Sequence, residues 1–494
     1  MTELRPHAER PRRLSRRSFL TTAVLLTGGT ALLAACSSAP AAQPTAAPAK
    51  PAEATKPAAA SPAAAASPAA AAAPAASPAA AASPAASPAA SPAASPAASP
   101  AAAAPQAAPA AASGGQLSGT IKVVSSLPRT GSSKGQTDTI VNAIKMALDE
   151  ASMKVGGATV VYEDMDDATP ARGAWDAGKE AENANKAVAD ADVMVYVGTF
   201  NSGAAKVAIP ILNRANLVMI SPANTYPGLT KPGKGEPNEP DVYYPGGRRN
   251  YARVVPADDL QGAVAANWSK QVGATKVYIL DDTELYGHGI AVVFAETANK
   301  IGLSIAGGPE GIDSKASDYR ALATKIRGTG ADMVYYGGIT QNNAGKLFKD
   351  LRSVLGNNIK IMGPDGIYEQ AFIDDAGDAA EGVYVTFGGV PPTKLAGKGA
   401  EWYRSYKSKF NAEPEAYAAY GYESTKVALA AIEKAGRKDR AAIRDAVFAT
   451  KDYDGVLGKW SFDPNGDTSL TTMSGRQVKN GKFDDENAVT LQAT

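Results

Sequence analysis

The chain contains very little cysteine and histidine. Its 494 residues include a single Cys, Cys36, and two His, His7 and His288. One Cys cannot form a disulfide within the chain or a thiolate metal cluster. Two His placed far apart likewise exclude a Cys/His metal site and Cys–His or His-clustered catalysis. We therefore expect neither a metal nor a cofactor.

The part of the chain from Leu117 onward also carries no excess of positive charge. Of its 50 Lys and Arg and 49 Asp and Glu, eight basic and three acidic residues precede Leu117, which leaves 42 basic and 46 acidic residues after it. No basic stripe interleaved with aromatic residues occurs. A general affinity for nucleic acid or for anionic lipid is therefore excluded.

The first 36 residues have the pattern of an export signal. A basic stretch, Arg5–Arg17, precedes an apolar run, Leu20–Ala35, that is too short and interrupted to span a membrane comfortably. Ser15–Leu20 (SRRSFL) resembles the twin-arginine export motif, and Leu33–Cys36 (LAAC) resembles the bacterial lipobox, in which the Cys is acylated. The motifs predict an extracytoplasmic protein that is anchored to the cell membrane by lipid on Cys36. The alternative is an ordinary N-terminal helix with an isolated Cys.

Residues 37–116 have the composition of a linker. From Ala39 to Ala112 the chain is almost entirely Ala, Pro and Ser. Frequent Pro forbids a continuous helix, and no side chain in this stretch is large enough to build a core. We predict a disordered tether between the signal and a folded body that begins near Leu117.

The body alternates short apolar runs with segments of helical periodicity. Apolar residues recur at helical spacing from Ile140, from Val264 and from Leu347. Between such segments lie eight apolar runs, at residues 121–124, 159–162, 193–197, 217–220, 276–280, 333–336, 359–362 and 383–387. Continuous apolar strands that alternate with helices are typical of parallel sheets covered on both faces. The length of the body exceeds one such sheet. We therefore predict an α/β fold with two doubly wound parallel-sheet lobes joined by a hinge.

Small, hydroxylic or acidic residues follow five of these predicted strands. In such sheets ligands bind beyond the carboxyl ends of the strands. Each loop alone has a residue composition that is ordinary for a turn, but together the loops predict a cleft lined with polar groups. They are Gly198–Gly203, Ser221–Thr225, Asp281–Gly287, Gly337–Gln341 and Gly363–Gly366.

These loops carry a family resemblance. Between Ile121 and Asp467 the sequence resembles the leucine/isoleucine/valine-binding proteins, the type I periplasmic binding proteins of ABC transporters. The matching stretches, in order, are Ile220–Thr225 (ISPANT), Met333–Gly338 (MVYYGG), Met362–Gly366 (MGPDG) and Ala376–Gly382 (AGDAAEG). The resemblance implies a monomer that captures a branched-chain or related amino acid by clamshell closure and delivers it to an ABC transporter permease. It also implies a first lobe of residues 117–254 and 386–457 and a second lobe of residues 255–385 and 458–494.

The resemblance also implies the ligand-binding residues. Ser202 and Thr225 would bind the α-carboxylate of the ligand. The Ala223 carbonyl, the Thr225 hydroxyl and Asp365 would bind its ammonium group, and Tyr286 would close over it from the second lobe. Gly203 and Ile339 complete the predicted set. Ser202 could alternatively act as a helix N-cap, and Asp365 as a turn residue.

Several alternatives remain open on the sequence alone. The ligand could be an amide, a urea-like compound or an aromatic acid, and the protein could be a ligand sensor for a receptor. A hydrolase is a further alternative, but the chain has no GxSxG motif, and a Ser–His–Asp site would have to use His288. The Pro- and Gly-rich segment Lys231–Arg249 is interpreted as an insertion.

Overall fold

The first lobe is built on a six-stranded sheet. The computed structural model describes residues 117–492, so the predicted signal, Cys36 and the whole predicted tether lie outside the described residues. Strands β3, β1, β6, β7 and β8 are parallel, and β2 pairs antiparallel with β3. The sheet order is β2 (Lys154–Val155), β3 (Gly157–Asp166), β1 (Ser118–Leu127), β6 (Val193–Gly198), β7 (Val218–Ser221) and β8 (Tyr251–Arg253).

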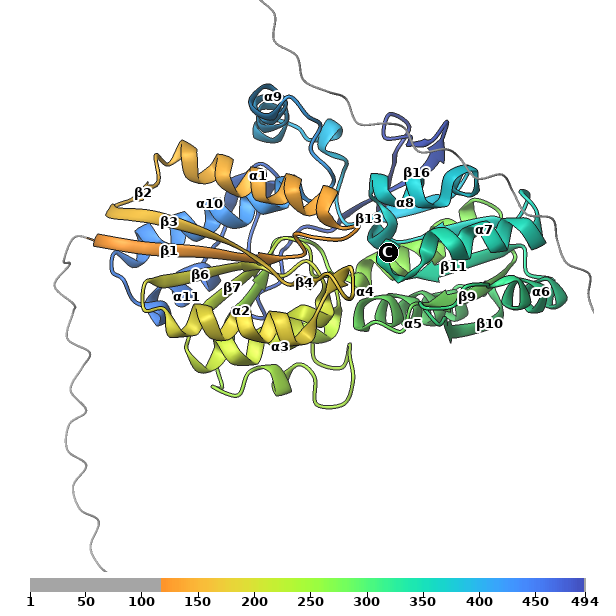
Figure 1. Ribbon diagram of the computed structural model, residues 1–494, viewed down its shortest axis with the longest axis horizontal. Helices are drawn as coiled ribbons and strands as arrows, with labels where there is room; N and C mark the ends of the chain where they lie inside the picture. Colours follow the sequence, from red (N-terminus) through yellow and green to blue (C-terminus); the bar gives the residue numbers. More distant parts are fainter. Residues whose placement is uncertain (1–116, 493–494) are drawn as a thin grey trace, which may run out of the picture. The chain divides into compact units, whose positions relative to one another are not determined.

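Helices cover both faces of this sheet (Figure 1). Neighbouring residues of β6 point to opposite faces: Val195 and Val197 belong to one hydrophobic cluster, and Tyr196 belongs to another. The first face is covered by α1 (Lys134–Glu150), α10 (Ala418–Ala435) and α11 (Arg440–Phe448), and the second by α2 (Ala177–Ala189) and α3 (Ser202–Arg214). Because both faces are buried, the strands need continuous apolar runs, as the sequence predicted.

The second lobe repeats this plan. Its sheet has parallel strands β9–β13 and an antiparallel strand β16 beside β13. In spatial order the strands are β10 (Ser304–Gly311), β9 (Lys276–Asp281), β11 (Met333–Gly337), β12 (Lys360–Gly363), β13 (Tyr384–Phe387), β16 (Thr472–Lys479) and β17 (Lys482–Phe483), with β18 (Val489–Gln492) paired to β16. The covering helices are α4 (Asp258–Gln271) and α5 (Leu285–Lys300) on one face and α6 (Arg320–Thr329) and α7 (Ala344–Leu355) on the other. The predicted fold class is confirmed.

The chain passes between the two sheets three times. The first passage joins β8 to α4. The second follows Phe387, since β13 still pairs with β16 there, across the predicted boundary at 385/386. The third lies beyond 457/458, because Trp460 donates to Glu423 of α10 (2.7 Å) and Asp467 pairs with Arg253. Long-range pairing therefore places the second and third passages slightly after the predicted positions.

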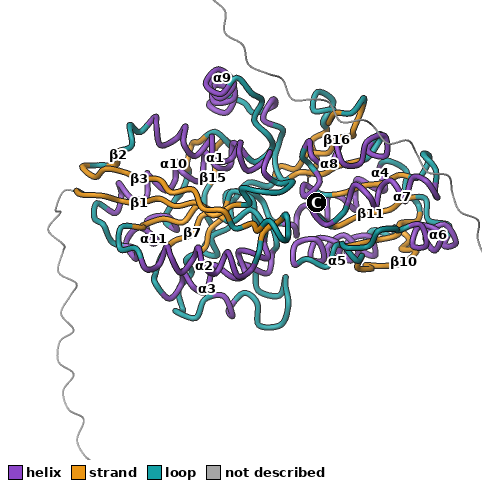
Figure 2. Tube along the Cα trace, in the orientation of Figure 1, coloured by secondary structure: helices purple, strands orange, loops and turns teal. Residues whose placement is uncertain are grey.

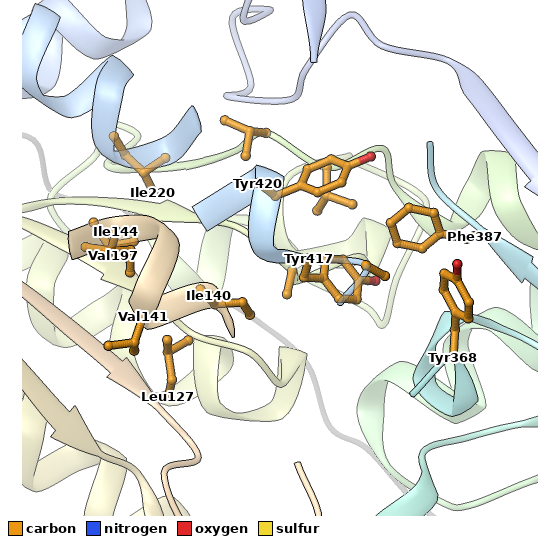
Figure 3. Packing of buried hydrophobic residues seen from close by; sticks show 14 of the residues in the cluster. Leu127, Ile140, Val141, Ile144, Val197, Ile220, Tyr368, Phe387, Tyr417 and Tyr420 are labelled. Carbon is orange, nitrogen blue, oxygen red and sulfur yellow. The ribbon is translucent and has the colours of Figure 1, made fainter. Parts of the chain in front are cut away.

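A shared hydrophobic core connects the lobes. One cluster contains aliphatic residues of α1 and the first sheet together with the interior of the second lobe. Figure 3 shows the connection, in which Tyr417 and Tyr420 of the first lobe face Phe387, and Phe387 lies beside Tyr368. The ring centroids of Phe387 and Tyr417 are 5.3 Å apart, and those of Phe387 and Tyr368 are 5.4 Å apart. The Phe387–Tyr417 pair is an edge contact, and aromatic pairs of this kind add stability beyond the burial of area.

The segment 231–249 forms an irregular loop with one short 3-10 turn, η2 (Asp241–Tyr243). Glu239 is buried in it and accepts hydrogen bonds from the hydroxyls of Tyr226 (2.8 Å) and Tyr243. Lys231 reaches α4 of the second lobe and pairs with Asp259 at 2.7 Å. The loop is therefore held near its middle by Glu239 and, at its first residue, against the second lobe by Lys231.

Two carboxyl groups are buried inside the first lobe. Glu180 accepts hydrogen bonds from Ser126 (2.5 Å) and Tyr196 (2.8 Å). Neither carboxyl oxygen of Asp167 has a hydrogen-bond partner among the described residues. Burial raises the pKa of Asp167 well above its usual value, and the nearby charge of Asp166 raises it further. Burial also raises the pKa of Glu180, with the charge of Asp167 as the second cause.

This arrangement predicts that Asp167→Asn stabilises the protein at neutral and alkaline pH. A folded-state pKa above the unfolded value gives stability that is present below the unfolded pKa and is lost as the pH rises through the folded one. The amide has no proton to lose, so the Tm of the variant relative to wild type should increase between pH 5 and pH 8. Thermal melts across this range test it, with the exposed Asp241→Asn as the control. A Tm difference between Asp167→Asn and wild type that does not change with pH would contradict the prediction.

Candidate functional site

The predicted site residues all follow the carboxyl ends of strands. Ser202 and Gly203 begin α3 after β6, and Ala223 and Thr225 follow β7. In the second lobe, Tyr286 lies in the first turn of α5 after β9, Ile339 follows β11, and Asp365 follows β12. In Figure 2 the teal loops at these strand ends gather between the two sheets. The parallel topology of each lobe thus directs these residues to one region.

The structure brings all seven predicted residues around one cavity. The cavity has an empty volume of about 430 Å³, counted with its opening to solvent. Its walls also include six residues that were not predicted: Trp175, Phe200, Asn201, Glu284, Gly366 and Tyr417. Four of them lie in loops that the sequence analysis had singled out. Trp175 and Tyr417 do not, and nothing in the local sequence indicated them.

The first-lobe wall is a helix start beside a tightly held loop. Asn201, not Ser202, occupies the N-cap position of α3, and its side chain makes no capping bond. The first N–H groups of the helix therefore lack a side-chain acceptor. The Ser202 hydroxyl instead accepts the N–H of Tyr226 at 3.3 Å. Such a helix end favours a negative group because of its free donors and its dipole.

The loop that carries Ala223 and Thr225 is fixed from below. The Ser221 hydroxyl accepts the backbone N–H groups of Ala223 (3.1 Å) and Asn224 (2.8 Å). The buried guanidinium of Arg253 donates to the carbonyls of Asn224 (3.2 Å) and Tyr226 (2.8 Å). These bonds hold the loop backbone in one conformation, so its polar groups are positioned before any ligand arrives.

Asp365 is the central polar group of the second-lobe wall. Its carboxylate accepts hydrogen bonds from Gln261 (2.6 Å), Tyr286 (2.8 Å) and Tyr417. Tyr417 belongs to the first lobe, so this contact joins the two walls. Burial raises the pKa of Asp365 in spite of the three donors. A buried carboxyl with a raised pKa gains from a nearby cation, which stabilises its charged form.

A second buried carboxyl, Asp258, lies close to Asp365. Its backbone N–H donates to the Thr225 carbonyl at 2.9 Å, and neither of its carboxyl oxygens has a partner among the described residues. Burial raises its pKa well above the usual value, and the charge of Asp365 raises it further. The residues that line the cavity include Asp365 and Glu284 but no Lys, Arg or His. The cavity therefore favours a positive group on its ligand.

The geometry does not support the hydrolase alternative. His288 is paired with Asp281 (3.1 Å), its side chain is half exposed, and it does not line the cavity. In residues 117–492 no group of three or more His, Cys, Asp or Glu side chains could hold a metal ion. No helix within this range is both long and apolar enough to cross a membrane.

Two α/β lobes with a cavity between their strand ends are the architecture of a solute-binding protein. A family model described as periplasmic binding protein matches residues 120–482. The chain is also 30% identical to a Leu/Ile/Val-binding protein homologue of Brucella abortus over 378 residues, which cover 75% of this chain and 94% of the relative. The chain therefore belongs to the periplasmic binding protein family, and within it to the leucine/isoleucine/valine-binding type. It is a substrate-binding protein of the ABC-transporter type, not an enzyme.

Two solved structures agree with this assignment. The leucine-binding protein LivK of Thermotoga maritima superposes with a TM-score of 0.66 at 25% identity, and the match covers 75% of this chain and 98% of that protein. LivJ of Streptococcus pneumoniae, solved in complex with isoleucine, gives a TM-score of 0.64 at 26% identity, covering 76% and 99% of the two chains. Both matches extend over almost the full length of the known structures.

Proposed function

We propose that the protein captures a branched-chain or related amino acid and delivers it to the permease of an ABC importer. The observation that carries the proposal is the pairing of opposite chemistries in one cavity. The start of α3 offers unpaired N–H donors on one side, and the buried carboxyl of Asp365 lies on the other. A zwitterion satisfies both at once, because its carboxylate meets the donors and its ammonium meets the acid.

Each predicted residue has a role in this scheme. The Ser202 and Thr225 hydroxyls bind the carboxylate, and Asp365, the Ala223 carbonyl and the Thr225 hydroxyl accept hydrogen bonds from the ammonium. Tyr286 covers the ligand from the second lobe. Gly203 and Ile339 contribute close backbone approach and apolar contact. Because the anchors come from both lobes, a ligand that touches all of them favours the closed state by its extra contacts.

The rival ligands fit the charge of the cavity less well. A simple aromatic acid could place its carboxylate at the start of α3, but it would leave the buried carboxyl of Asp365 without a cation. A neutral amide or urea-like compound would leave the buried carboxyl of Asp365 without a cation. The charge of the lining therefore favours an amino acid over each of these classes.

A thermal-shift panel on the chain from Leu117 onward tests the proposal. Leucine, isoleucine and valine should raise the Tm, since a ligand at a hundredfold excess over its Kd stabilises by about 2.7 kcal/mol. Benzoate, acetamide and urea at the same concentration serve as the comparison. Stabilisation by benzoate alone, with no response to any amino acid, would overturn the proposal. Uptake with a reconstituted permease then separates transport from ligand sensing.

The proposal includes the anchor and the assembly state. A monomer tethered by lipid on Cys36 would hold the binding lobes near the permease through the Ala/Pro/Ser-rich segment. Mass spectrometry of the mature N-terminus in membrane-extracted protein tests the anchor. An unmodified Cys36 there would refute it.

A further inference from the structure

Trp175 lines the cavity from a short hairpin that contains no other lining residue. The hairpin pairs β4 (Ala168–Thr169) with β5 (Ala174–Trp175). Directly after it, Asp176 donates its backbone N–H to the Asp167 carbonyl (2.8 Å), and its side chain caps α2. The Trp175 side chain is only 8% exposed and lines the cavity. The hairpin is thus fixed at its base while it presents an indole ring to the ligand space.

The indole ring lies directly on the first turn of α3. A Cβ atom added to Gly203 would lie 2.4 Å from Cζ2 and 2.8 Å from Cη2 of Trp175. Only glycine permits this approach, since any side chain there would displace the ring. The ring therefore cannot retreat toward α3 when a ligand presses against it.

The ring also contacts a side chain that reaches across the cleft. The guanidinium of Arg172 lies over the indole, 5.4 Å from the ring centroid. The same guanidinium is 3.5 Å from the carboxylate of Glu284, which belongs to the second lobe and lines the same cavity. Movement of the ring away from Arg172 would break this contact. Trp175 is therefore packed against the start of α3 and is also in contact with a cation that reaches the second lobe.

We propose that Trp175 is a specificity-determining residue that limits the ligand side chain to the size of valine, leucine or isoleucine. This inference rests on the proposed function. A flexible wall would accommodate a larger side chain by a rotamer change, whereas a buried ring packed against Gly203 of α3 turns extra ligand volume into steric conflict. Phenylalanine and tryptophan are the ligands it excludes.

The ratio of the Kd of phenylalanine to that of leucine, measured by calorimetry, tests this role. Trp175→Ala should shift the ratio in favour of phenylalanine by about 10- to 200-fold, the range that a hydrophobic pocket gives for small changes in fit. Trp175→Phe should shift it in the same direction by less, and it decides the matter if the alanine variant does not fold. Trp268→Phe changes a similarly buried indole on α4 that does not line the cavity, and it should leave the ratio unchanged.

The outcomes separate the two proposals. A wild-type protein that binds neither leucine nor phenylalanine would overturn the proposed function itself. If wild type binds leucine and both Trp175 variants keep the wild-type ratio, the role of Trp175 alone is refuted. A shift as large in Trp268→Phe as in Trp175→Phe would refute it as well.

Discussion

Asp365→Ala is expected to weaken leucine binding about 100- to 1000-fold or more. The variant would leave the ammonium of the ligand without a counter-charge inside the cavity. Removing one partner of a buried charged pair costs about 3–5 kcal/mol, and each 1.4 kcal/mol is a factor of about ten in Kd. Isothermal titration calorimetry of wild type and variant measures the change.

The hydrogen bonds around Asp365 add to this expectation. Gln261, Tyr286 and Tyr417 all donate to its carboxylate, so the alanine variant would also deprive three polar groups of their acceptor. Asp365→Asn keeps the shape but not the charge, and it should bind leucine weakly too. Because burial raises the pKa of Asp365 in the free protein, wild-type affinity should fall as the pH is lowered through that pKa. The amide variant should not show this fall.

Ser202→Ala provides the comparison on the opposite wall. It removes one hydroxyl but leaves the N–H groups at the start of α3, so its cost should be about 1.5–3 kcal/mol, the range for hydrogen bonds to charged groups. The expected order of affinity is therefore wild type, Ser202→Ala, Asp365→Ala. If Asp365→Ala binds as tightly as wild type, the ligand carries no ammonium at that position. An amide or a simple acid would then be the better interpretation.

Most of the strands that the sequence predicted share one physical property, which is burial on both faces. The exception is β3, in which buried and exposed residues alternate and Val161 is exposed. The apolar run Val193–Val197 falls within β6, and each of its side chains packs on one face or the other. β10 escaped prediction because it lies at the edge of its sheet and contains Gly307, Gly308 and Pro309. Edge strands tolerate Gly and Pro, so they lack the apolar signal. β16 pairs with β13 only after a long return of the chain, which local periodicity cannot reveal.

The residues of the site likewise divide into those that the local sequence could indicate and those that it could not. The loops that carry Ser202, Thr225 and Asp365 could be located because parallel topology sends every strand end to one edge of its sheet, and the family resemblance indicated these residues within them. Tyr417 reaches the cavity at the start of a helix that follows a chain crossing, and its partner Asp365 is distant in sequence. Trp175 reaches it through a hairpin whose two strands, β4 and β5, have two residues each. Neither position follows from periodicity or motif, because both depend on how separate segments pack in three dimensions.

The second large effect is expected from Asp467→Ala, which should destabilise the fold by about 3–5 kcal/mol. Asp467 accepts a hydrogen bond from Nε of Arg253 at 2.6 Å, and the Arg253 side chain is fully buried. Thr230 also donates to both Asp467 oxygens at 2.9 Å. The variant would leave a buried guanidinium without its counter-charge, and an uncompensated buried charge strongly destabilises the folded state. Urea unfolding of both proteins measures the loss.

An exposed ion pair of similar length serves as the control. Asp454 lies 2.8 Å from Lys398 and both side chains are largely exposed, so Asp454→Ala should cost no more than about 1 kcal/mol. Burial alone would raise the pKa of Asp467, but Arg253 holds it below its usual value. A depressed folded pKa gives stability that is present above the unfolded pKa and is lost as the pH falls through the folded one. The difference in unfolding free energy between wild type and Asp467→Ala should therefore shrink in acid.

Because Arg253 also holds the carbonyls of Asn224 and Tyr226 beside the cavity, Asp467→Ala should weaken leucine binding as well, although Asp467 does not line the cavity. Equal stability of the Asp467 and Asp454 variants at neutral pH would show that Arg253 finds another partner or water, and the proposed support of the loop would then fail.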